Sequence, residues 1–202
     1  MGADGEAERQ TPGAAAREIA TDRLVLRPQA AADGPALASM AADKAVASNL
    51  CAAIAPDGRN TFVIAGRDDP NAILGCAGYG VARDMPGSTE IGVWLGVPWW
   101  GRGYATEALQ ALIDRAFGED RLKALWCSSR VTNTRARRVI EKCGFQFRGT
   151  GMVRSPTAFG AFPVERFVLD RRNWESLKAW GARRSGTGKN DGTGETQRES
   201  AA

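Results

Sequence analysis

The chain has 202 residues, of which 43% are hydrophobic and 25% charged, values typical of one globular domain with a single sizeable core. Its formal net charge is +4 and the excess is scattered, which argues against a nucleic-acid partner but favours an anionic cofactor. The chain contains no histidine, so Ser-His-Asp triads, Cys-His pairs and imidazole bases are excluded.

The two ends of the chain differ from its middle. Residues 1–20 and 181–202 contain few large apolar side chains, so we expect a disordered leader and a disordered tail around one domain at 21–180. No segment resembles a signal peptide or reaches the roughly 20 apolar residues of a membrane span. The four cysteines form no CxxC pair, which favours reduced thiols over a zinc site. We therefore expect a cytoplasmic protein without metal or membrane partner.

The first half of the chain is rich in strand patterns. The stretch DRLVLRP (22–28) predicts a strand, and Asp33 with Pro35 predicts a helix that runs to about residue 44. Residues 45–60 carry no clear pattern. Strands at 61–67 and 72–81 form a predicted hairpin, and a longer strand at 88–97 ends before Pro98.

The second half alternates helices and strands. From Tyr104 the apolar residues recur at helical spacing until about Gly118, and a short strand is expected at 123–128. Asn133 is an expected N-cap of the next helix, with Gly144 at its left-handed C-terminal position. Two strands, 145–154 and 161–170, complete the pattern. This order indicates an α/β fold in which helices pack on a mixed sheet.

The junction between the strand at 88–97 and the following helix carries the sequence WWGRGYATEAL. Backbone N–H groups at a helix start have no intrahelical partner, and glycine lets a ligand approach them closely, so we expect a phosphate there. The dinucleotide motif GxGxxG fails at Thr106, and GxxxxGK[ST] is absent. The alternative is that the glycines only turn the chain.

A second motif, NTRARRVIEKCGF at 133–145, follows this loop. Together with PWWGRGYATEA it resembles the GNAT acetyltransferase superfamily. Gly103 and Ala105 match the glycine and small-residue positions of the superfamily's loop. Trp100 replaces the usual Arg or Gln, as in the ribosomal-protein N-acetyltransferase (RimJ/RimL-like) branch, whose opening TxRLxLRP is similar to DRLVLRP. The resemblance covers roughly residues 21–170.

The resemblance implies a GNAT fold with a mixed, mostly antiparallel sheet, helices on both faces, and a splay between the fourth and fifth predicted strands, 88–97 and 123–128. Acetyl-CoA would bind along the fourth strand, where a β-bulge at Gly96 is expected to free backbone N–H groups. Arg138, Arg102 or Lys142 would meet the 3′-phosphate, although each also fits a solvated helix face. The implied cofactor-binding residues are Leu95, Val97, Gly101, Arg102, Gly103, Tyr104, Ala105, Thr106, Asn133 and Arg138.

The implied activity is acetyl-CoA-dependent N-acetylation of a primary amine by direct attack in a ternary complex. Glu90 is the implied general base, the alternative being a surface glutamate at a strand edge. The usual acid positions hold Ile140 and Ala136, so water, Ser128, Ser129 or Tyr104 would have to supply a proton. Cys127 as an acetyl carrier is less favoured than Cys127 as a buried core residue.

A different class of function also fits these residues. Without an acid residue, the protein could be a non-catalytic acyl-CoA-binding sensor or partner protein. The acceptor amine, whether a protein N-terminus, an antibiotic or a polyamine, is not specified by the sequence, because residues 45–60 are unpatterned and 154–163 are mostly neutral. Either a monomer or a homodimer is compatible with the sequence.

Overall fold

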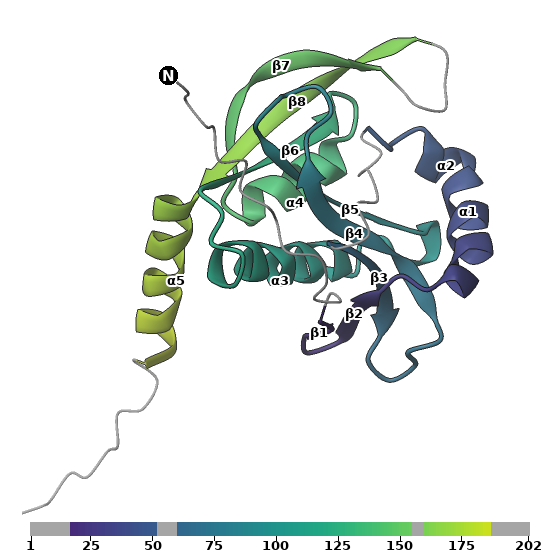
Figure 1. The fold of residues 1–202 in the computed structure, drawn as a ribbon, viewed down its shortest axis with the longest axis horizontal. Coiled ribbons are helices and arrows are strands. Elements are labelled where there is room, and N and C mark those ends of the chain that lie inside the picture. The colour runs from purple at the N-terminus through teal and green to yellow at the C-terminus, as the bar shows by residue number, and fades with distance from the viewer. Residues whose placement is uncertain (1–16, 52–59, 155–159, 187–202) are drawn as a thin grey trace, which may run out of the picture.

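The structure is a computed structural model that describes residues 17–51, 60–154 and 160–186, and one sheet runs through its centre (Figure 1). In these residues the sheet has eight strands, in the order β1-β2-β3-β4-β5-β6-β8-β7. All neighbours are antiparallel except β5 and β6. The predicted mixed, mostly antiparallel sheet is thus confirmed. The strands are β1 (Ile19–Ala20), β2 (Leu24–Pro28), β3 (Thr61–Gly66), β4 (Ile73–Val81), β5 (Thr89–Leu95), β6 (Ala124–Arg130), β7 (Gln146–Arg154) and β8 (Ala161–Asp170).

Helices cover both faces of this sheet, as predicted. The alternation along β3 separates the faces: Phe62 and Ile64 belong to the large core cluster that includes α3, whereas Val63 packs with Leu37 of α1. The apolar stripe of α3 is buried along its length, which confirms the helical spacing seen in the sequence. The helices in the described residues are α1 (Gly34–Ala42), α2 (Lys44–Ala47), α3 (Tyr104–Gly118), α4 (Thr134–Lys142) and α5 (Arg171–Gly186).

Both predicted ends of α4 are confirmed. The Asn133 side chain accepts a hydrogen bond from the Ala136 N–H at 3.0 Å, so it is the N-cap. Gly144 has φ +90°. The positive φ favours glycine, and a Cβ at Gly144 would in addition displace the Leu177 side chain of α5, whose Cδ1 would lie 2.4 Å from it.

The structure extends past both predicted domain boundaries. β1 lies inside the predicted leader and pairs with β2, and α5 runs to Gly186, beyond residue 180. Trp174 of α5 stacks on Phe117 with ring centroids 5.4 Å apart and donates a hydrogen bond to Asp114 at 2.8 Å. Most of the predicted leader and tail, 1–16 and 187–202, lies outside the described residues. Among the residues that the structure describes, no helix is both long and apolar enough to cross a membrane.

Candidate functional site

The sheet splays between β5 and β6, where the sequence resemblance placed the opening. These two parallel strands share one register pair, Glu90 with Trp126. The Gly96 N–H bonds to Leu74 of β4, and backbone groups alternate in direction along a strand. The N–H groups of Val93 and Leu95 therefore point away from β4, toward the opening. No strand of the described residues pairs with that edge of β5 after Glu90.

The β-bulge expected at Gly96 is wrong. The β4–β5 register is regular from Thr89 to Leu95, and β5 ends at Leu95, before Gly96. The edge of β5 is left unpaired because β6 diverges, so no bulge is needed. Val97 lies in a short 3₁₀ turn rather than in the strand. Trp100 closes this turn: its indole Nε1 donates to Leu95 O at 2.8 Å, a role that the sequence did not suggest.

The loop after this turn presents a row of unpaired backbone donors. Gly101 and Gly103 have φ values of +74° and +83°, a region that favours glycine. Among the described residues, none accepts a hydrogen bond from the N–H groups of 101–106, and Glu107 is the first donor of the helix, to Gly103 O at 3.1 Å. Because α3 has no side-chain cap, these donors and the helix dipole favour an anionic ligand.

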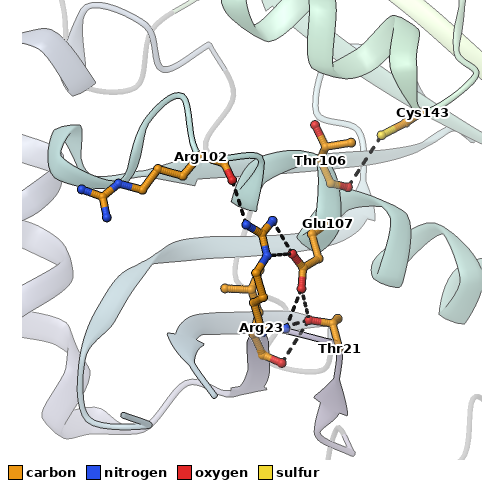
Figure 2. A network of polar contacts seen from close by, with 7 residues as sticks. Thr21, Arg23, Arg102, Thr106, Glu107 and Cys143 are labelled. Carbon is orange, nitrogen blue, oxygen red and sulfur yellow. Dashed lines mark hydrogen bonds and ion pairs between the residues drawn. The ribbon is translucent and has the colours of Figure 1, made fainter. Parts of the chain in front are cut away.

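Arginines surround this loop. The Arg102 guanidinium lies 5.5 Å from the Trp99 ring centroid, and Arg135 of α4 lies 5.5 Å from that of Trp100. Arg138 is exposed on the same helix. The contact of Arg135 with Trp100 places α4 beside the loop, and the Cys143 thiol, at the C-cap of α4, contacts Thr106 O in the first turn of α3 at 3.9 Å (Figure 2). The sequence motifs missed Arg135, since a cation–π contact between separate elements leaves no local pattern.

Glu90 lies at the point where the strands separate. It is partly buried, and burial is the main cause that raises the pKa of its carboxyl above the usual range. The negative charge of Asp84 raises this pKa further, whereas Ser128 and the positive charge of Arg166 lower it. Arg166 is itself paired with Asp84 across the sheet. A raised pKa makes a carboxylate a better proton acceptor near neutral pH.

The groups considered as proton donors differ in their surroundings. Ile140 is 4% exposed in the core, and neither its side chain nor the methyl group of Ala136 carries an ionisable proton, so neither position offers an acid. The Arg23 guanidinium lies over the Tyr104 ring, 4.7 Å from the centroid of that ring. Ser129 is buried and its Oγ has no hydrogen-bond partner in the described residues, whereas Ser128 is near enough to Glu90 to lower the pKa of that carboxyl. Ser128 and Ser129 are adjacent in β6, so their side chains face opposite sides of the sheet.

The thiol of Cys127 is part of the main core cluster. Burial raises the pKa of Cys127 well above its usual value, and Cys51, Glu90 and Cys143 add to that rise. The thiol therefore stays protonated and is a poor nucleophile. In the described residues, no group of three or more His, Cys, Asp or Glu side chains is arranged to hold a metal.

The segments expected to shape an acceptor pocket are partly described. Residues 52–59 of the first and 155–159 of the second lie outside the described residues. The first segment reaches β6 at its described end: the Cys51 thiol donates to Ser128 O at 3.0 Å, and Arg130 Nε donates to Leu50 O at 3.2 Å. Arg130 also stacks over Phe162, 3.7 Å from its ring centroid. These contacts bring both segments close to β6, beside Glu90.

Comparison with known proteins gives a sequence relative for part of the chain and solved structures of similar fold for most of it. Over 81 residues it is 31% identical to the uncharacterized N-acetyltransferase p20 of Bacillus licheniformis; the match covers 40% of the chain and 46% of that relative, about half of its length. The solved GNAT-family acetyltransferase of Bacillus anthracis has a TM-score of 0.63 at 21% identity, over 77% of this chain and 99% of the other.

A candidate ribosomal-protein-serine acetyltransferase of Vibrio cholerae has a TM-score of 0.62 at 19% identity, over 76% of this chain and 97% of the other. At these identities the two solved structures establish the fold alone. The model of the acetyltransferase (GNAT) domain matches residues 23–146, more than half of the chain, and includes the splayed strands, the loop and α4. The chain therefore belongs to the GNAT acetyltransferase family.

Proposed function

We propose that this protein is an acetyl-CoA-dependent N-acetyltransferase that moves an acetyl group to a primary amine by direct attack in a ternary complex. One observation carries the proposal: the unpaired edge of β5 connects Glu90 at the splay with the unpaired donors of 101–106. Glu90 and Leu95 are separated by five residues of extended chain, about 16 Å. This length is comparable to that of a pantetheine arm, so the pyrophosphate and the thioester would reach the two ends together.

Each part of acetyl-CoA has a matching group in this arrangement. The pyrophosphate would accept hydrogen bonds from the N–H groups of 101–106, and the pantetheine amides would pair with Val93 and Leu95 as an added strand. The Asn133 side chain would assist the arm through its amide nitrogen, because its oxygen is already used as the cap. Arg102, Arg135 and Arg138 are the candidates for the 3′-phosphate.

The chemistry requires one proton transfer and one bond exchange. The amine nitrogen attacks the thioester carbonyl carbon, the C–S bond breaks, and CoA leaves as a thiolate, while the amine proton passes to Glu90 directly or through a water. A free thiol has a pKa near 8.5, so the thiolate can leave without a protein acid. The transfer can therefore proceed although Ile140 and Ala136 occupy the usual positions of the acid.

For the acceptor, we propose a protein N-terminal amine, and for the location, the cytoplasm, where acetyl-CoA is available. The support is the sequence likeness to the RimJ/RimL-like branch and the fold likeness to the Vibrio cholerae protein. An α-amino group has a pKa near 8, so a larger fraction is already deprotonated at neutral pH than for a lysine side chain. The absent acid residues favour a second candidate, a non-catalytic acyl-CoA-binding protein.

The proposed function is tested by measuring the release of free CoA thiol from acetyl-CoA, with peptides, polyamines and aminoglycosides as acceptor amines. Glu90→Gln is expected to lower kcat/KM by about 100-fold at pH 7 and to leave acetyl-CoA affinity unchanged. The deficit should shrink as the pH rises and the amine deprotonates unaided. Glu119→Gln changes an exposed glutamate at the far end of α3 and should behave as wild type. Tight acetyl-CoA binding without release to any amine would support the non-catalytic candidate instead.

A further inference from the structure

Three side chains join the turn between β1 and β2 to the first turn of α3. The Glu107 carboxylate accepts hydrogen bonds from Thr21 Oγ1 at 2.6 Å, from the Arg23 N–H at 2.9 Å and from Arg23 Nε at 2.7 Å. Thr21 is itself held in a turn, because its Oγ1 accepts the Leu24 N–H at 2.9 Å. Figure 2 shows the three side chains converging beneath the 101–103 loop.

Arg23 also bonds directly to the loop. Its Nη1 donates to Arg102 O at 3.0 Å, and its guanidinium lies over the Tyr104 ring. In Figure 2 the Arg102 carbonyl faces Arg23, whereas the Arg102 side chain extends away from it. The peptide unit is planar and trans, so the C=O of Arg102 and the N–H of Gly103 point in opposite directions. By binding the carbonyl, Arg23 directs the Gly103 N–H away from itself.

The charges of this cluster support the same role. A carboxylate one turn into α3 would repel an anion bound at the start of that helix. Glu107 instead forms an ion pair with Arg23 at 2.7 Å, with 17% of its side chain exposed. Burial opposes ionisation of Glu107, but the hydrogen bonds from Thr21 and Arg23 outweigh it, so the pKa of Glu107 is lowered. The carboxylate of Glu107 therefore stays ionised at neutral pH, and the Arg23 guanidinium balances its charge.

We infer that Arg23 is a positioning residue for phosphate binding: anchored by Glu107 and Thr21, it holds the Arg102–Gly103 peptide so that the Gly103 N–H faces the pyrophosphate of acetyl-CoA. This inference rests on the proposed function, which places the pyrophosphate on the loop. The alternative is that Arg23 and Glu107 form an ordinary exposed ion pair, which contributes little, since half of the Arg23 side chain is exposed.

The two alternatives predict different ligand dependence. S-acetylpantetheine carries the thioester and the arm of acetyl-CoA but lacks the pyrophosphate. If Arg23 orients the loop, Arg23→Ala should weaken acetyl-CoA binding about tenfold in calorimetry and leave the KM for S-acetylpantetheine unchanged. Arg23→Lys should keep the ion pair with Glu107 but lose the second, forked hydrogen bond to Arg102 O. It should therefore keep the melting temperature of wild type and still bind acetyl-CoA several-fold more weakly.

Lys178→Ala is the matched control. The Lys178 side chain is 57% exposed, against 50% for Arg23, and pairs with Asp114 of the same helix α3 at 2.7 Å, so this variant should bind both ligands as wild type does. An unchanged acetyl-CoA affinity in Arg23→Lys and Arg23→Ala would overturn the inference, and so would an equal loss for both ligands. If wild-type protein itself fails to bind acetyl-CoA, the proposed function fails, and this outcome is distinct from a loss confined to the variants.

Discussion

Replacing Gly103 by aspartate is expected to place a negative charge among the donors proposed to bind pyrophosphate. A carboxylate about 5 Å from one phosphate charge, at an effective dielectric constant of about 20, costs about 3 kcal/mol. Each 1.4 kcal/mol is a factor of ten in affinity, so the unshielded effect is roughly 100-fold. The new Cβ would lie 3.3 Å from Arg23 Nη2, and that guanidinium shields part of the charge. We therefore expect Gly103→Asp to bind acetyl-CoA at least tenfold more weakly than a neutral variant.

Gly103→Asn is the neutral variant that isolates the charge. Gly103 has φ +83° and ψ −5°, a conformation that asparagine and aspartate tolerate better than other residues at a cost of about 1 kcal/mol. Both variants introduce the same strain and nearly the same volume, and in both the new Cβ would meet the Arg23 guanidinium at the same distance. Their melting temperatures should agree, and the difference in acetyl-CoA affinity should then report the charge alone.

Isothermal titration calorimetry of both variants at low and high salt is the decisive measurement. The gap between Gly103→Asp and Gly103→Asn should narrow as salt is added, because screening weakens the repulsion. If the two folded variants bind acetyl-CoA equally at low salt, the pyrophosphate does not lie on this loop and the reasoning from the unpaired N–H groups is refuted.

Two further predictions concern the other ends of the proposed site. Because burial raises the folded-state pKa of Glu90 above the usual glutamate value of about 4.5, the ionised carboxylate destabilises the folded protein at pH values above that raised pKa. Glu90→Gln should therefore melt at a higher temperature than wild type at pH 7, with the gap closing as the pH falls toward 4; a lower melting temperature at pH 7 would mean that the Ser128 and Arg166 contacts dominate. Asn133→Ser keeps a side-chain cap for the Ala136 N–H, whereas Asn133→Ala loses the cap and should lower the free energy of unfolding by about 1 kcal/mol. Asn133→Ser should therefore melt at the wild-type temperature but bind acetyl-CoA more weakly. If its acetyl-CoA binding is unchanged, Asn133 has the capping role alone.

Local chemistry made much of the site predictable. The period of α3, the Asn133 cap and the left-handed Gly144 are each determined by a few adjacent residues, as are the positive φ angles of the loop glycines. Such features depend on backbone sterics and hydrogen bonds within one turn, so a sequence pattern records them directly. The loop could be predicted as an anion site for the same reason, before any strand partner was known.

Other features have no local record. The α5 helix shows no clear apolar stripe in the sequence, and its docking depends on Trp174 meeting Phe117, 57 positions earlier in numbering. The final strand β8 lies between β6 and β7, an order that alternation within each strand does not specify. The β5 edge is left unpaired because β6 diverges after Trp126, whereas local reasoning placed a bulge at Gly96.

The sequence by itself determined the helices α1, α3 and α4, the strands β2 to β8, and where a row of unpaired N–H groups would lie. Only the tertiary structure decided what surrounds them: the splay at Glu90, the raised pKa of that carboxyl, and the contact of Arg23 with Glu107 across 84 positions. The physical reason is that backbone conformation is set by neighbours along the chain, whereas strand order, burial and long-range pairing are set by how the whole chain buries its apolar surface.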